Sequence, residues 1–126
     1  MLRLAVVAAV SFALPVTALS DKSFGGSAGA SWDCKTDPVV VITGGSAHYT
    51  FKGECKSISL TGGHNTLTIE SSGSLDITGA SNTATIDAVD AININGAQNK
   101  VTWKKGKSSP KPTVSQLGQK NVITQG

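Results

Sequence analysis

The sequence has 126 residues, with 11 basic and 8 acidic side chains that give a formal net charge of +3 at neutral pH. This length suffices for one domain. A nucleic-acid surface would need clustered basic residues interleaved with aromatic ones, and only 5% of the residues are aromatic. We therefore expect a single domain that does not bind nucleic acid.

Residues 1–20 have the pattern of a secretory signal peptide, with a short basic start, an apolar run from Ala5 to Leu14 and a zone of small residues. We place the cleavage site after Ser20, with Ala18 as the alternative. The apolar run is shorter than the roughly 20 residues that span a bilayer. The sequence therefore predicts export, to the periplasm or the cell exterior, without a membrane span.

Two cysteines, Cys34 and Cys55, follow this segment. In an exported protein they are expected to form a disulfide, and two buried free thiols are the alternative. Two cysteines without a nearby histidine cannot hold a structural zinc ion. We expect no metal and no other cofactor.

A corner motif, G-x-x-N, recurs along the rest of the chain. Copies begin at Gly62, Gly79 and Gly96, 17 residues apart, and another begins at Gly118. A degenerate copy begins at Gly44. Apolar residues alternate with polar ones before and after each corner, so each copy predicts two short strands.

One pair of short strands cannot bury its apolar face alone, so the copies must stack. The predicted fold is all-β, a small single-domain β-solenoid of about five turns over residues 40–126. Residues 21–39 form an N-terminal flexible or cap segment in this prediction. A two-sheet sandwich is the alternative, but the equal spacing of the corners favours the solenoid.

The asparagines of the corners should stack into an amide ladder with a structural role. The members of this ladder are Asn65, Asn82, Asn99 and Asn121.

A lysine-rich segment interrupts the repeat before its last copy and is expected to loop out. The lysines that could contact an anionic surface are Lys104, Lys105, Lys107 and Lys111. The last copy offers an open strand edge to a partner, formed by Val122, Ile123 and Thr124. Alternatively, the lysine-rich loop folds over this edge and shields it.

The run from Gly53 to Gly126 resembles a bacterial exported family designated domain of unknown function number 3060. The resemblance rests on the serial corners, on Val101-Thr-Trp103, on the Pro110–Pro112 loop and on the final copy at 114–122. It implies an exported solenoid with no established activity. The segment 115–125 is also similar to the repeats of curli amyloid subunits.

No spacing of serine, histidine and acidic residues indicates a catalytic site. Polysaccharide-cleaving β-helices use clusters of acidic residues in a long groove. Asp76, Asp87 and Asp90 could form such a cluster, but the predicted solenoid has too few turns to form a groove around them. We predict no catalytic residues and a non-catalytic binding or structural module whose partner is unknown. The alternatives are an extracellular assembly subunit that self-associates through the C-terminal strand edge, and a small cell-envelope enzyme.

Overall fold

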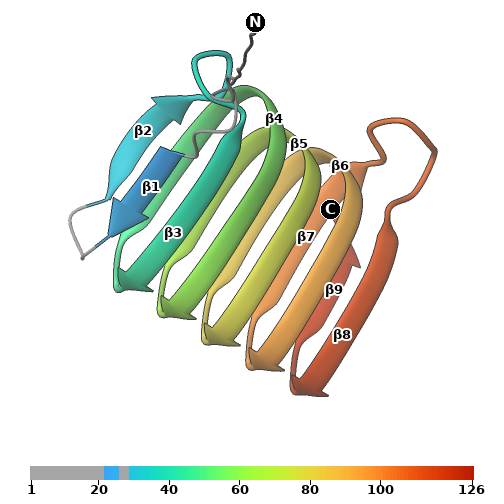
Figure 1. The fold of residues 1–126 in the computed structure, drawn as a ribbon. Helices are drawn as coiled ribbons and strands as arrows, with labels where there is room; N and C mark the ends of the chain where they lie inside the picture. The colour runs from blue at the N-terminus through green and yellow to red at the C-terminus, as the bar shows by residue number, and fades with distance from the viewer. Residues whose placement is uncertain (1–21, 26–28) are drawn as a thin grey trace, which may run out of the picture.

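The alternating segments form parallel strands in the computed structural model, which describes residues 22–25 and 29–126. The strands are β1 (Lys22–Gly25), β2 (Ala30–Asp33), β3 (Val39–Gly45), β4 (His48–Gly63), β5 (Thr66–Ala80), β6 (Thr83–Ala97), β7 (Lys100–Lys105), β8 (Thr113–Gln119) and β9 (Val122–Gln125). They belong to one nine-stranded sheet that coils into about six turns (Figure 1). The predicted all-β solenoid is confirmed, and the described part of the chain contains no helix.

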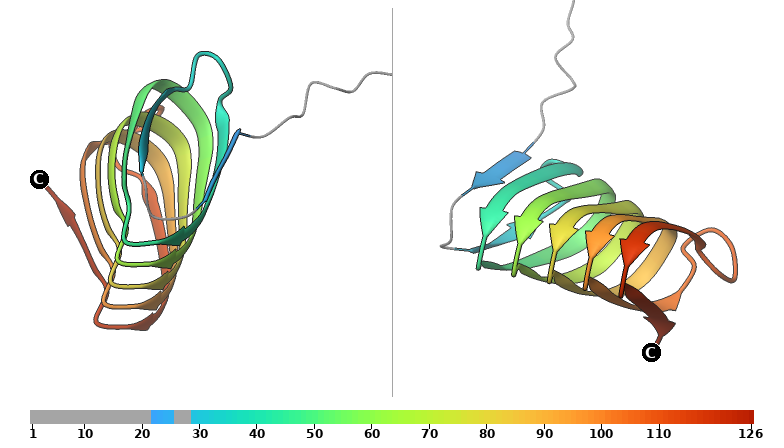
Figure 2. Two further views of the ribbon diagram at one scale, coloured as in Figure 1. Left: turned by 90° about the vertical axis from the view of Figure 1, so that its left-hand side faces the viewer. Right: turned by 90° about the horizontal axis from the view of Figure 1, so that it is seen from below.

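Each long strand serves two turns of the coil. β4, β5 and β6 start after one corner, bend around the third side of the coil and end at the next corner. In β4 the bend includes a break in register between Phe51 and Glu54, where Gly53 has a φ of 78°. The end-on view in Figure 2 shows the successive coils lying over one another.

The core consists of columns of apolar side chains. Leu75 lies beside Ile58 in the preceding turn and beside Ile92 in the following one. These three side chains are fully buried. Burying a large apolar side chain contributes about 1.5–3 kcal/mol, so the columns are the main source of stability.

Each corner holds two residues with positive φ. Gly79 has a φ of 136°, and a Cβ on it would lie 1.8 Å from the carbonyl oxygen of Gly62. Ser81 has a φ of 60° although it carries a side chain. The sequence motif predicts the glycine, because only glycine fits so close to the neighbouring backbone.

The described residues of the predicted N-terminal flexible or cap segment form two strands that add a turn to the stack. β1 pairs with β3, and β2 pairs with β4. Phe24 and Trp32 lie in register with Ile42 and Phe51 and continue two core columns. The Lys22 ammonium lies 5.3 Å and 4.6 Å from the centroids of these two rings and covers that end of the stack. The predicted signal peptide, residues 1–20, lies outside the described residues.

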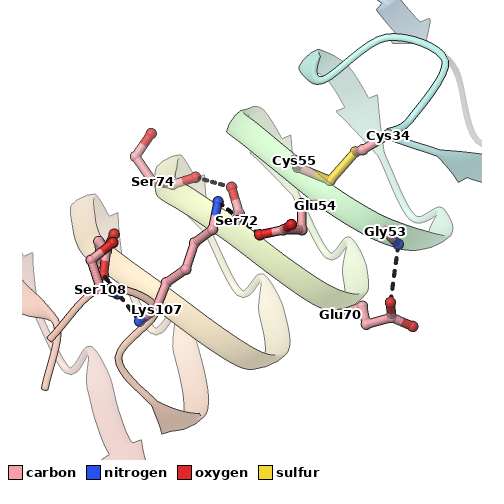
Figure 3. Close-up of polar contacts among 10 residues, drawn as sticks. Cys34, Gly53, Glu54, Cys55, Glu70, Ser72, Ser74, Lys107 and Ser108 are labelled. Atoms are coloured by element: carbon pink, nitrogen blue, oxygen red, sulfur yellow. Dashed lines mark hydrogen bonds and ion pairs between the residues drawn. A yellow bond between two sulfur atoms is a disulfide. The ribbon is translucent and has the colours of Figure 1, made fainter. Parts of the chain in front are cut away.

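Cys34 and Cys55 form the predicted disulfide, with 4.9 Å between their Cα atoms. Cys34 directly follows β2, and Cys55 lies in the third side of the coil within β4 (Figure 3). Both side chains are buried. The bond therefore fastens the added turn to the rest of the stack.

Candidate functional site

The corner asparagines form a continuous ladder of hydrogen bonds. The side-chain Nδ2 and the backbone N–H of Asn82 both donate to Asn99 Oδ1, each at 3.0 Å. The same Nδ2 donates to the Gly62 carbonyl at 2.9 Å. Asn65 donates to Asn82, and Asn99 donates to Asn121, in the same way. Each asparagine therefore uses the turns on both sides of it.

The ladder has a direction, because the backbone N–H of each asparagine donates to its C-terminal neighbour. The residue before the asparagine follows this rule too: Ser81 N–H donates to the Ala97 carbonyl at 3.1 Å and Gln98 N–H to the Gln119 carbonyl at 3.0 Å. Lys120 and Asn121 occupy these positions in the last turn. Within residues 22–25 and 29–126 their backbone N–H groups have no acceptor.

The candidate partner edge lies at the same end of the stack. β9, which contains Val122, Ile123 and Thr124, pairs with β7. No other strand of the described chain pairs with β9, and β8 pairs only with β6. The outer edges of both strands are open over the described residues.

Apolar side chains surround this open edge. Val114 is 42% exposed, whereas Ile92, its neighbour in the preceding turn, is fully buried. Leu117 is 67% exposed and Val122 is 46% exposed. We call β8, β9 and the corner between them the β8–β9 end.

The lysine-rich loop does not cover this end. The backbone N–H groups of Ser108 and Lys107 donate to Asp90 Oδ1 at 2.6 Å and 3.0 Å. The bond from Ser108, above all, holds the pKa of the Asp90 carboxyl below its ordinary value. Lys107 N–H also lies 3.2 Å from the Val89 carbonyl. The loop is thus fastened to the third side of the coil, where Figure 3 shows Lys107 and Ser108. Every residue of β8 remains exposed.

Two of the four lysines that were predicted to contact an anionic surface form ion pairs within the chain. Lys104 pairs with Asp87 at 3.6 Å, and Lys107 pairs with Glu54 at 3.4 Å. Lys105 and Lys111 are exposed and form no ion pair within the described chain. The lysines therefore do not form a single cluster of unpaired charges.

Two contacts of the loop have a signal in the sequence that the G-x-x-N motif does not carry. Lys104 follows Asp87 by one repeat length, and Lys107 follows Asp90 by the same interval, 17 residues. Residues one repeat apart are neighbours in this stack. The repeat length therefore predicts both contacts.

Asp76, Asp87 and Asp90 each have a separate partner. Asp76 accepts a hydrogen bond from Asn93 Nδ2 at 2.8 Å, Asp87 pairs with Lys104, and Asp90 binds the loop. No three metal-ligating side chains come together in residues 22–25 and 29–126. The described chain also contains no helix that is long and apolar enough to cross a membrane.

The family model described as "Protein of unknown function (DUF3060)" matches residues 61–120. The resemblance to this family is confirmed. The DUF3060 match begins at the corner before Asn65 and includes the lysine-rich loop and β8. No curated protein and no solved structure matches the chain. The DUF3060 description assigns no activity.

Proposed function

We propose that this protein is an exported, non-catalytic β-solenoid module that binds a protein partner through its β8–β9 end. The open edge of β8 and β9 carries this proposal. Unpaired strand edges readily accept a further strand through backbone hydrogen bonds. Val114, Leu117 and Val122 add apolar area beside that edge.

Export is supported by the signal-like pattern of residues 1–20 and by the buried Cys34–Cys55 disulfide. Disulfides persist in oxidising compartments such as the periplasm and the cell exterior. A non-catalytic role is supported by the acidic residues, because Asp76, Asp87 and Asp90 each hold a neighbouring turn or loop.

A different protein fits the β8–β9 end better than a second copy of this chain. A second copy stacked in register would place its Lys22 beside Val114, since both continue the same core column. Burying that ammonium between two turns is costly. Lys22 instead covers the aromatic rings of its own end of the stack.

Photo-crosslinking in bacterial cells tests this proposal. A photoreactive residue replaces Val122 in one variant and Thr66 in the control, because both belong to the same outward column but Thr66 lies within the stack. We expect a discrete crosslinked product in the exported fraction from position 122 only. Identical products at both positions, or none at position 122, would contradict binding at this end. Retention of the chain in the cytoplasm would contradict export.

A further inference from the structure

We propose that the β8–β9 end recognises a parallel strand–corner–strand segment of a partner protein, with an asparagine or aspartate side chain at its corner. This inference rests on the proposed function and specifies the partner's chemistry. It follows from the direction of the ladder. Lys120 and Asn121 direct towards the partner the same donors that the inner turns direct towards their neighbours.

The inner turns show what these donors require. Asn82 needs one side-chain oxygen, Asn99 Oδ1, which accepts from both its backbone N–H and its Nδ2. Ser81 needs one backbone carbonyl, that of Ala97. A partner that continues the pattern must therefore present a carbonyl and, close to it in its corner, a carboxamide or carboxylate oxygen. Asparagine and aspartate have side chains of the required length, and asparagine also has the Nδ2 donor that the Gly62 carbonyl accepts from Asn82 in the inner turns.

The flanking strands define the rest of the partner. β8 and β9 offer Val114 and Ile123 at positions where the inner turns hold buried apolar columns. A partner strand on each side of the corner should therefore carry inward apolar residues at every second position. Their burial, and not the corner bond alone, would supply most of the binding energy.

The chain's own N-terminal turn does not meet this requirement. The residues between β1 and β2, from Gly26 to Gly29, are glycine, serine and alanine, without a carboxamide or carboxylate. A second copy could pair its strands with β8 and β9, but the sequence between its β1 and β2 would offer Asn121 no carboxamide or carboxylate oxygen. The N–H groups of Lys120 and Asn121, unpaired within the described residues, therefore favour a partner with a corner asparagine or aspartate. They disfavour both a second copy of this chain and strands that lack such a corner.

A synthetic peptide of residues 74–87 is a suitable probe, because it contains a complete strand–corner–strand unit of this chain. Its matched control carries alanine at the position of Asn82. Titration of the fluorescently labelled peptides with the full chain should show that the control binds about tenfold more weakly, the effect of losing hydrogen bonds to buried donors. With the Asn121→Ala variant of the protein, the difference between the two peptides should shrink but not vanish, because the backbone N–H of residue 121 remains a donor, as that of Ala47 is to Asn65 Oδ1.

Asn121→Asp provides a second variant in case Asn121→Ala is unstable. The carboxylate that it introduces would still accept from Asn99, but the variant loses the Nδ2 donor and gains a negative charge. A peptide with aspartate at its corner should bind the unmodified chain more weakly than the asparagine peptide, because it lacks the Nδ2 group that donates to a glycine carbonyl in the inner turns. It should bind Asn121→Asp at least tenfold more weakly still, because two carboxylates would then face each other. Circular dichroism melting of each variant verifies that it is folded.

Failure of this inference is distinguishable from failure of the proposed function. Equal binding of the asparagine and alanine peptides to the unmodified chain would overturn the role of the corner, although crosslinking at position 122 could still occur. Absence of peptide binding up to about 1 mM would overturn the inference as well. If the chain forms concentration-dependent oligomers that do not bind the peptide, the occupant of the β8–β9 end is a second copy of the chain and the inference is wrong.

Discussion

Asn99 Oδ1 accepts two hydrogen bonds from Asn82: the backbone N–H and the Nδ2 group of Asn82 each donate to it at 3.0 Å. Because both residues are buried, water cannot replace a missing partner. The ladder is therefore a network in which the loss of one side chain leaves donors of the preceding turn unsatisfied.

Asn82→Ala should lower the free energy of unfolding by about 1–3 kcal/mol, because Asn65 loses the acceptor for its backbone N–H and its Nδ2. Asn121→Ala should cost less, since Asn121 lies at the end of the stack, where it is only partly buried. Urea denaturation of both variants provides the comparison. Small and equal losses would show that the ladder contributes little to stability.

Gly79→Ala should be among the most destabilising single changes in the repeat. The added Cβ would lie 1.8 Å from the Gly62 carbonyl oxygen, so the corner would have to move and the ladder beside it would be disturbed. Ser81→Gly in the same corner is the control, because glycine tolerates the φ of 60° that Ser81 adopts. We expect Ser81→Gly to stay within about 1 kcal/mol of the original stability. Equal losses for the two variants would contradict this account.

Cys55→Ser should lower the free energy of unfolding by about 3 kcal/mol, since the disulfide closes a loop with a sequence separation of 21 residues. Limited proteolysis should then cleave first in the segment before Val40. Cys34→Ser should behave in the same way, and a reductant should have no further effect on either variant. Unchanged proteolysis would show that strand pairing alone holds the N-terminal turn.

Asp90→Ala should release the lysine-rich loop, with trypsin cleaving faster after Lys107. Asp87→Ala is the control, because Asp87 contacts Lys104 through side chains only. The pKa of Asp90 is lowered in the folded chain, so the anchor is fully present above the ordinary value of 3.8 and is lost as the pH falls through the lower, folded-state value. Loop cleavage rates, corrected for trypsin activity, should therefore be constant from about pH 5 to 8.

An NMR titration can follow the protonation of Asp90 at low pH, where trypsin cannot be used. The amide proton of Ser108 donates to Asp90 Oδ1, so its chemical shift should report the carboxyl's protonation. We expect a midpoint below 3.8. A midpoint at or above that value would mean that the loop is not anchored by the carboxylate.

The repeat length was sufficient to predict most of the stack. Once Gly62, Gly79 and Gly96 are aligned, the core columns and the asparagine ladder follow, because parallel pairing keeps equivalent residues side by side. The turn formed by β1 and β2 could not be found in this way. Its strands are only four residues long and flank a segment without a G-x-x-N corner.

The details of the candidate site were only partly accessible from the sequence. The open edge at Val122 follows from the position of the last copy, but the direction of the ladder depends on which turn each asparagine donates to. The anchoring of the loop depends on the path of the chain after Lys105. The 17-residue interval between Asp90 and Lys107 was the available indication of that path.

The repeating pattern of the ladder also makes the interior turns interchangeable. Each interior corner donates to the next turn what it accepts from the turn before, so an additional 17-residue copy between Gly79 and Gly96 would fit without altering its neighbours. Such an insertion would move the two ends apart by about 4.8 Å, the spacing of paired strands. Duplication of one repeat could therefore change the distance between the two ends in fixed steps, while the surface at either end stays the same.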